Sequence, residues 1–353
     1  MAATHQWHAV GDGLHTWVHP IGDWGWSNAG LITTRDEALL IDTQWDERRT
    51  CDLLAIAPLP LGSRITTLVL THGDGDHVWG NRAVAADEII ASEATAEHLA
   101  SEDPVRFGRT ARLVAGLART PLPKLPGPAR RIGELGSFAR YMTRMTAPWA
   151  YSEVRRTGPT RTFKGELELQ VGERPLRLVD VGSAHSPGDT YVHLPDDRVV
   201  FAGDLLFVGV APVMWVGPVR GWVAALDEIR ALEPRVVVPG HGPVGGAEDL
   251  DVLRDYWAWV IEVGEHSRAA KLSPAKAAEL AILDSEHDTL PWGSWWSPER
   301  LVISLTALDR EARQRGPIHS LVDRARVMLE TAAVADRLRA EGLTTTSFGP
   351  PTI

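Results

Sequence analysis

The sequence predicts an α/β fold with a helical insertion and a helical C-terminal extension. Apolar strand patterns recur between residues 30 and 245, with helix-like stretches between some of them. Helical patterns broken by proline occupy residues of about 93–160, and helical patterns dominate after residue 246. We therefore expect a main domain over residues 1–245, with the insertion at about 93–160, and an extension over 246–353.

The first elements alternate between strand and helix patterns. Residues 30–42 fit two short apolar strands around a polar turn, which favours an antiparallel start. A helix over 47–57 should end at Pro58, because proline cannot continue a helix. Two further strands are expected at 65–70 and 88–91.

Strand patterns return after the insertion, which contains the proline-rich stretch PLPKLPGP at 121–128. The expected strands are 167–171, 176–181, 191–194, 199–202 and 236–238, with a helix over 221–232 before the last. In the extension, Ser273 and Ser297 each precede a proline, a combination typical of a capped helix start.

Composition limits the classes of function. The only cysteine is Cys51, which excludes internal disulfides and thiolate metal clusters, so a metal would be held by His and carboxylates. The formal net charge of −10 disfavours nucleic acid as a partner. The N-terminal residues lack a basic and apolar leader pattern, and the apolar run 205–219 is short and contains two prolines. We expect a cytoplasmic protein with a small-molecule substrate and no membrane partner; a homodimer is compatible with the sequence.

The segment THGDGDH carries the strongest chemical signal. It places His72, Asp74, Asp76 and His77 within six residues after an apolar strand. Strand or helix geometry would scatter these side chains, so we expect a tight loop. Imidazole and carboxylate ligands together suit zinc, iron or manganese.

Three later segments share this pattern of an apolar strand followed by a His or Asp. They contain His185, Asp204 and His241. Side chains at the same ends of neighbouring strands converge in space, so we expect them to join the first segment in one site.

Together these segments resemble the metallo-β-lactamase superfamily, whose signature is H-x-H-x-D-H followed by a distant His, Asp and His. The resemblance covers about residues 10–245 and implies a four-layer αββα sandwich. It implies two ligand groups and a bridge between them: His72, Asp74 and His185 for a first metal ion, Asp76, His77 and His241 for a second, and Asp204 for both.

One position departs from the signature, because Asp74 stands where the family has its second histidine. The additional carboxylate makes bound metals weaker Lewis acids and favours harder ions. We expect two divalent ions, zinc first, with iron, manganese or a single ion as alternatives.

The resemblance implies hydrolysis by a metal-activated water. Asp76 is then either a ligand and general acid/base or a ligand only. Asp42 is a candidate to hold a ligand imidazole, although a strand-end turn also favours Asp. The remaining histidines, including His98, match no ligand position, and His15 and His19 are the least secure of these exclusions.

The 14 tryptophans bear on the substrate. We expect Trp24, Trp26 and Trp215 to line a pocket, because they lie in Gly/Pro-rich loops near ligand segments, and Trp222, Trp257 and Trp259 to pack in the core. This favours an apolar or aromatic ester, lactone, thioester or amide.

Two other enzyme classes and a non-enzymatic role remain as alternatives. Asp74 favours an iron-dependent oxygen or redox enzyme, but no flavin motif is evident after residue 246. A lyase or decarboxylase would use the same Lewis acid. A degenerate binding protein is disfavoured, because the other signature residues are intact.

Overall fold

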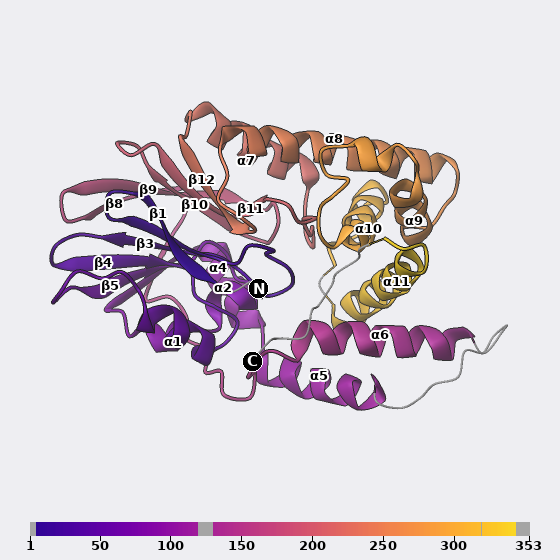
Figure 1. The fold of residues 1–353 in the computed structure, drawn as a ribbon, viewed down its shortest axis with the longest axis horizontal. Helices are drawn as coiled ribbons and strands as arrows, with labels where there is room; N and C mark the ends of the chain where they lie inside the picture. The colour runs from indigo at the N-terminus through magenta and orange to yellow at the C-terminus, as the bar shows by residue number, and fades with distance from the viewer. Residues whose placement is uncertain (1–4, 119–129, 319, 344–353) are drawn as a thin grey trace.

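Two β-sheets lie face to face in the left half of Figure 1, with helices on their outer sides. The computed structural model describes residues 5–118, 130–318 and 320–343. The predicted four-layer αββα sandwich, with helices added to it, is confirmed.

The first sheet has seven strands that follow one another in chain order. They are β1 (Gln6–Gly11), β2 (Leu14–Val18), β3 (Ala29–Thr33), β4 (Glu37–Ile41), β5 (Arg64–Val69), β6 (Glu88–Ser92) and β7 (Arg161–Phe163). Strands β1 to β4 pair antiparallel, as expected for the start of the chain, whereas β4 to β7 pair in parallel. The hairpin β1–β2 and the short β7 were not among the predicted strands.

The second sheet has five strands in the order β12-β11-β10-β9-β8. They are β8 (Glu166–Val171), β9 (Arg174–Gly182), β10 (Asp189–Leu194), β11 (Val199–Phe207) and β12 (Val236–His241). All nine residues of β11 are buried, because both faces of this strand are covered. The strand extends beyond its predicted end at 202 and includes the first three residues of the apolar run 205–219.

Apolar side chains from both sheets fill the space between them. Leu14, Ile32 and Leu39 of the first sheet meet Leu178 and Val192 of the second, and all five are at most 1% exposed. Each buried aliphatic side chain of this kind contributes roughly 1.5–3 kcal/mol to folding. This core fixes the relative position of the two sheets, and therefore of the loops at their edge.

Helices form the outer layers. Helix α1 (Glu47–Ala55) and the short α3 (Asn81–Val84) belong to the layer on the first sheet. Helices α7 (Val219–Ala231) and α8 (Ala247–Ala269) cover the second sheet (Figure 1). Helix α7 connects the parallel strands β11 and β12, and it lies close to the predicted 221–232.

The segment 93–160 contains three helices in its described part: α4 (Glu93–Ser101), α5 (Pro104–Ala118) and α6 (Arg130–Thr146). Helix α4 follows β6 directly, with the Ser92 hydroxyl accepting from Thr95 N as a cap. Helices α5 and α6 lie beside each other, away from the sheets (Figure 1). The proline-rich stretch 121–128 falls outside the described residues.

Beyond α8 the chain forms α9 (Pro274–Leu283), α10 (Leu301–Ala312) and α11 (Leu321–Ala340). Ser273 caps α9 as expected, accepting from Lys276 N. Ser297 differs from the expectation: its backbone has φ of 57°, and its hydroxyl donates to Asp23 Oδ1 at 2.7 Å. The start of the following turn is thereby tied to a loop of the first sheet.

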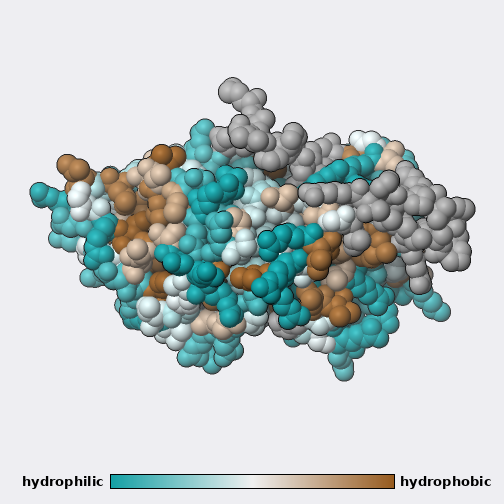
Figure 2. Space-filling view, turned by 90° about the horizontal axis from the view of Figure 1, so that it is seen from below, coloured by the Kyte–Doolittle hydropathy of each residue, from teal (hydrophilic) through white to brown (hydrophobic). Residues whose placement is uncertain are grey.

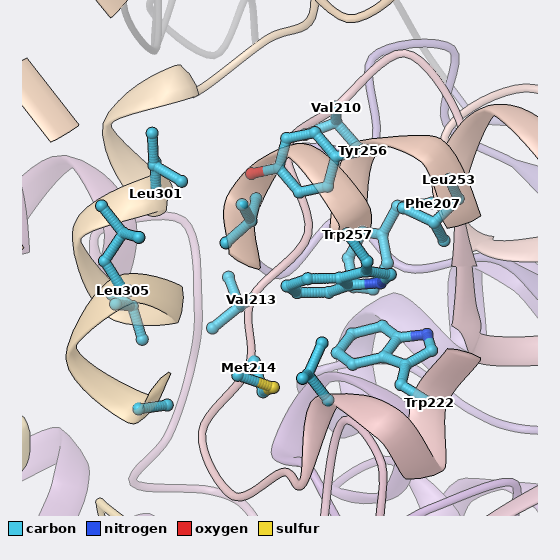
Figure 3. Close-up of a cluster of buried hydrophobic side chains, with 14 of the residues drawn as sticks. Phe207, Val210, Val213, Met214, Trp222, Leu253, Tyr256, Trp257, Leu301 and Leu305 are labelled. Atoms are coloured by element: carbon cyan, nitrogen blue, oxygen red, sulfur yellow. The ribbon is translucent and has the colours of Figure 1, made fainter. Parts of the chain in front are cut away.

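The C-terminal helices share a buried core with the second sheet's outer layer. Figure 3 shows Trp222 of α7 and Trp257 of α8 packed against each other, with Leu301 and Leu305 of α10 on the opposite side of the cluster. Trp222 and Trp257 are fully buried, as expected for core tryptophans. The helices after residue 246 are therefore packed onto the sandwich rather than separate from it.

The surface is mixed in character. The face in Figure 2 is largely hydrophilic, with apolar patches separated by polar surface. Among the described helices, none is long and apolar enough to cross a membrane.

Candidate metal centre

Seven His and Asp side chains from four chain segments meet at one edge of the sandwich, at or near the ends of β5, β9 and β12 and, for Asp204, within β11. They are the seven residues expected from the sequence: His72, Asp74, Asp76, His77, His185, Asp204 and His241. Asp74 is partly exposed, with 19% side-chain exposure, while the other six residues are buried.

The THGDGDH segment is not one loop throughout, contrary to expectation. His72 and Asp74 lie in the extended turn after β5, whereas Asp76 and His77 belong to α2 (Gly75–Val78), a single helical turn. Successive helical residues are rotated by about 100°, so the side chains of two neighbouring residues can still reach one common centre. The helical turn therefore gathers Asp76 and His77 as well as a loop would.

The first group consists of His72, Asp74 and His185. Asp74 Oδ2 lies 2.8 Å from His185 Nε2 and 4.0 Å from His72 Nε2. One ligand atom from each residue falls within 4.8 Å of the others.

The second group consists of Asp76, His77 and His241. His241 Nε2 lies 3.3 Å from Asp76 Oδ2 and 3.5 Å from His77 Nε2. These three also place one ligand atom each within 4.8 Å of the others.

Asp204 lies between the two groups. Its Oδ1 is 3.1 Å from His77 Nε2, and its Oδ2 is 3.3 Å from His185 Nε2. Oδ2 also lies 3.5 Å from His241 Nε2, so this one carboxylate reaches both groups, an arrangement suited to a bridging ligand.

Each of the four imidazoles has its Nδ1 beside a protein oxygen, which leaves Nε2 facing the centre. The contacts are His72 to Thr71 Oγ1 at 2.9 Å, His77 to Asp42 Oδ2 at 2.8 Å, His185 to Val213 O at 2.6 Å and His241 to Gly22 O at 3.0 Å. Such contacts fix the orientation and tautomer of metal-binding histidines.

Asp42, at the end of β4, holds two parts of the THGDGDH segment. Besides facing His77 Nδ1, it accepts from Thr71 N at 2.8 Å and from Thr71 Oγ1 at 2.6 Å. It therefore supports the His77 imidazole and orders the strand end at the same time.

The residues fit divalent metal ions. His72 Nε2 is buried and has no hydrogen-bond partner among the described residues. A buried polar atom without a partner is costly, and ligation by a metal would satisfy it. Four imidazoles and three carboxylates form a donor set suited to two divalent ions.

The carboxylates of the His/Asp centre strongly influence the pKa values of its histidines. Burial opposes protonation of His77, but the Asp204 and Asp42 carboxylates raise its pKa well above the ordinary value. Burial likewise opposes protonation of His185, yet Asp204 and Asp74 raise its pKa to about 10. Metal-free, the centre therefore retains protons that a metal ion must displace.

A cavity of about 650 Å³ opens onto this centre. Asp74, Asp76, His185, Asp204 and His241 line one part of it. Much of the rest is apolar. Three helices contribute Phe107, Ala111 and Val114 of α5, Phe138, Met142 and Met145 of α6, and Leu321, Ala325 and Met328 of α11.

The tryptophan predictions are correct in part. Trp24 and Trp215 line the cavity as expected, but Trp26 does not: it is partly buried, stacks on His19 and meets the Trp149 ring at a tilt. Trp45 and Trp79 line the cavity as well. Of the less secure histidines, His15 lies on β2, and the buried His19 accepts from Gly22 N through Nδ1 at 3.2 Å.

One residue near the centre has no counterpart in the sequence prediction. His98 of α4 places Nε2 3.7 Å from Asp74 Oδ1. It belongs to none of the four ligand segments, so the pattern of a strand followed by His or Asp could not identify it.

Comparison with known proteins agrees with the fold and centre. The profile of the metallo-beta-lactamase superfamily matches residues 22–241, a span that contains all seven side chains. The chain therefore belongs to this superfamily.

Two curated relatives are distant. A linear primary-alkylsulfatase from Pseudomonas sp. (strain ATCC 19151) is 26% identical over 64% of this chain, a match that spans only 43% of the relative. A type 2 metallo-beta-lactamase from Bacteroides fragilis is 25% identical over 69% of this chain and 81% of the relative.

Solved structures show the same fold. A metallo-beta-lactamase from Pontibacter korlensis superposes with a TM-score of 0.52 at 19% identity, covering 72% of this chain and 99% of the neighbour. A stereoselective inverting sec-alkylsulfatase from Pseudomonas sp. gives 0.57 at 17% identity, covering 87% of this chain and 50% of the neighbour.

Proposed function

We propose that this protein hydrolyses an ester-type or amide-type bond in a small molecule with an apolar or aromatic body, using two divalent ions, zinc in first place. The proposal includes carboxylic esters, lactones, thioesters and amides. It rests chiefly on one observation: the cavity of about 650 Å³ joins the His/Asp centre to an apolar wall.

The size and lining of the cavity favour a substrate of this kind. Small-molecule sites are commonly several hundred Å³ in volume and mostly apolar, with a few polar groups that fix orientation. Here the His/Asp centre occupies one part of the cavity. The helical part combines apolar residues such as Phe138, Met142 and Met328 with charged ones such as Arg106 and Arg324. An apolar body could lie against those helices while its cleavable bond faces the centre.

Divalent ions in the two groups would supply Lewis acidity, which activates water and polarises the bond to be cleaved. His72, Asp74 and His185 would hold one ion and Asp76, His77 and His241 the other, with Asp204 bridging. Asp76 lines the cavity, so its carboxylate can also orient the attacking water and pass a proton to the leaving group. Trp24, Trp215 and Phe207 add apolar surface to the same cavity.

Asp74 supports a second candidate, an iron-dependent oxygen or redox enzyme. Its carboxylate lies with His72 and His185 in the first group, and an added carboxylate favours harder ions over zinc. Metal analysis of protein purified without added metal separates the two functions. Bound iron together with oxygen consumption would favour this candidate and overturn the hydrolase proposal.

The hydrolase proposal is tested by activity of the metal-reconstituted protein on esters, lactones, thioesters, amides, β-lactams and alkyl sulfates. His77→Ala is the blank, and we expect it to lose roughly 100-fold or more in kcat, because it removes a ligand of the second group. His193→Ala, a buried histidine on β10 that does not line the cavity, is the matched control and should retain activity. Equal turnover by wild type and His77→Ala would refute the site.

A further inference from the structure

Asp74 presents its two oxygens to different neighbours. Oδ2 faces the first group, 2.8 Å from His185 Nε2, whereas Oδ1 points away from it toward His98 Nε2 at 3.7 Å. A carboxylate that binds a metal through one oxygen needs a partner for the other if its orientation is to be fixed.

His98 is placed to be that partner. Its side chain is only 4% exposed, and neither ring nitrogen has a hydrogen-bond partner among the described residues. Nε2 lies just beyond hydrogen-bond distance of Asp74 Oδ1 and also 3.6 Å from Glu102 Oε1. Two carboxylate oxygens beside one nitrogen favour the tautomer with its proton on Nε2.

The motif backbone makes room for this imidazole. A Cβ on residue 73 would lie 2.7 Å from His98 Nδ1 and 2.9 Å from His98 Cβ, closer than such atoms pack. Gly73 therefore lets His98 sit directly against the turn that carries Asp74.

Two further charges extend from His98 to the C-terminal helices. Glu102 follows His98 by four residues, and its Oε1 lies 3.2 Å from Nη1 of Arg324 on α11. Arg324 also lies over the Trp215 ring at 5.4 Å, and both line the cavity. The order Asp74, His98, Glu102, Arg324 thus connects the first group to α11 through alternating acidic and basic side chains.

We propose that His98 is a positioning residue that donates to Asp74 Oδ1, holding Oδ2 toward the first metal position, with Glu102 and Arg324 steadying the imidazole. The inference rests on the proposed ligand role of Asp74. It links the unusual carboxylate in the motif to a histidine outside the motif.

The test is binding of Zn²⁺ to the full-length metal-free protein, measured by competition with a chromogenic chelator, together with Co²⁺ absorption spectra. His98→Leu should lower the affinity for one of the two ions about 10- to 100-fold and alter the Co²⁺ spectrum. His98→Gln, whose amide can still donate to Asp74, should remain within a few-fold of wild type. His193→Leu is the control for losing a buried imidazole elsewhere, and it should bind both ions normally.

A double variant separates positioning from packing. In an Asp74→Ala background, His98→Leu should cause no further loss, because the group that it orients is gone. Wild-type binding by His98→Leu, or equal losses in both backgrounds, would overturn the inference. Unchanged binding by Asp74→Ala alone would instead refute the ligand set. If His98→Leu does not fold, Glu102→Gln takes its place, because Glu102 is more exposed. It should lower Zn²⁺ affinity less than His98→Leu would, and unchanged affinity would contradict the inference.

Discussion

At the scale of single residues, the centre depends on the group that each imidazole contacts through its Nδ1 atom. His77 and His241 differ in the acceptor at Nδ1, a carboxylate for the first and a backbone carbonyl for the second. A carboxylate partner raises the basicity of a ligand imidazole more than a carbonyl does. Metal binding by His77 should therefore depend more on its Nδ1 partner, Asp42, than metal binding by His241 depends on its carbonyl partner.

Asp74 is the residue whose substitution best separates metal identity from fold. We expect Asp74→His to shift preference toward zinc over iron or manganese, because it replaces an anionic oxygen donor with neutral nitrogen. Parallel titrations with Zn²⁺, Mn²⁺ and Fe²⁺ under anaerobic conditions would measure the change. Identical affinities and stoichiometry before and after substitution would show that Asp74 is not a ligand.

Metal affinity should rise with pH. Neighbouring carboxylates raise the pKa of His77 well above its ordinary value and that of His185 to about 10, so both imidazoles are protonated at neutral pH without metal. Metal ligation requires neutral imidazole, so each ion must displace protons, and fewer remain to be displaced as pH increases. We expect roughly tenfold tighter binding per pH unit for each proton released.

Chelator competition at pH 6, 7 and 8 measures this dependence. Calorimetry in buffers of different ionisation enthalpy gives the number of protons released. Binding that is independent of pH, with no proton release, would show that the cluster does not retain protons in the metal-free state.

At the scale of elements, the helices α5, α6 and α11 supply much of the apolar lining of the cavity. Ala111 on α5 faces the cavity, and Ala111→Leu would extend into space that a substrate's apolar body needs. If 4-nitrophenyl esters are substrates, KM for the octanoate should rise about tenfold, corresponding to about 1.4 kcal/mol, while the acetate is little affected.

Arg112→Leu is the control for this prediction, because it adds an apolar side chain to the exposed side of the same helix. It should leave both esters unaffected. Equal KM changes for octanoate and acetate in Ala111→Leu would mean that α5 does not contact the longer chain.

The strand-borne part of the centre could be predicted from sequence because each ligand lies close to the strand that positions it. Thus β5 precedes His72, and β12 ends at His241. The one-turn helix under Asp76 and His77 was not predicted, because four residues carry too little periodic pattern to identify a helix. Three strands, β1, β2 and β7, were missed as well.

The long-range contacts could not be predicted. His98 meets Asp74 through packing of α4 beside the motif, and no local spacing connects the two residues. Met328 of α11 likewise reaches the cavity only through packing of the C-terminal helices. Trp26 was assigned to the pocket because of its Gly-rich loop, but it packs against His19, Trp149 and the core of the first sheet instead.

At the scale of the whole molecule, three regions meet at one cavity. The sandwich supplies the His/Asp centre, the segment between β6 and β7 supplies α5 and α6, and the C-terminal helices supply α11. Arg300, just before α10, connects the C-terminal helices to the sandwich. Its Nη2 lies 2.7 Å from Asp23 Oδ1, and its guanidinium lies over the Trp24 ring. The helical additions are therefore part of the site's structure.

The most direct test of this account is an anomalous-difference map from crystals of the zinc-loaded protein, recorded at the zinc absorption edge. We expect two peaks about 3.5–4 Å apart, one among His72, Asp74 and His185 and the other among Asp76, His77 and His241. Asp204 should lie between them. Peaks elsewhere, with none beside these side chains, would contradict the proposed metal centre.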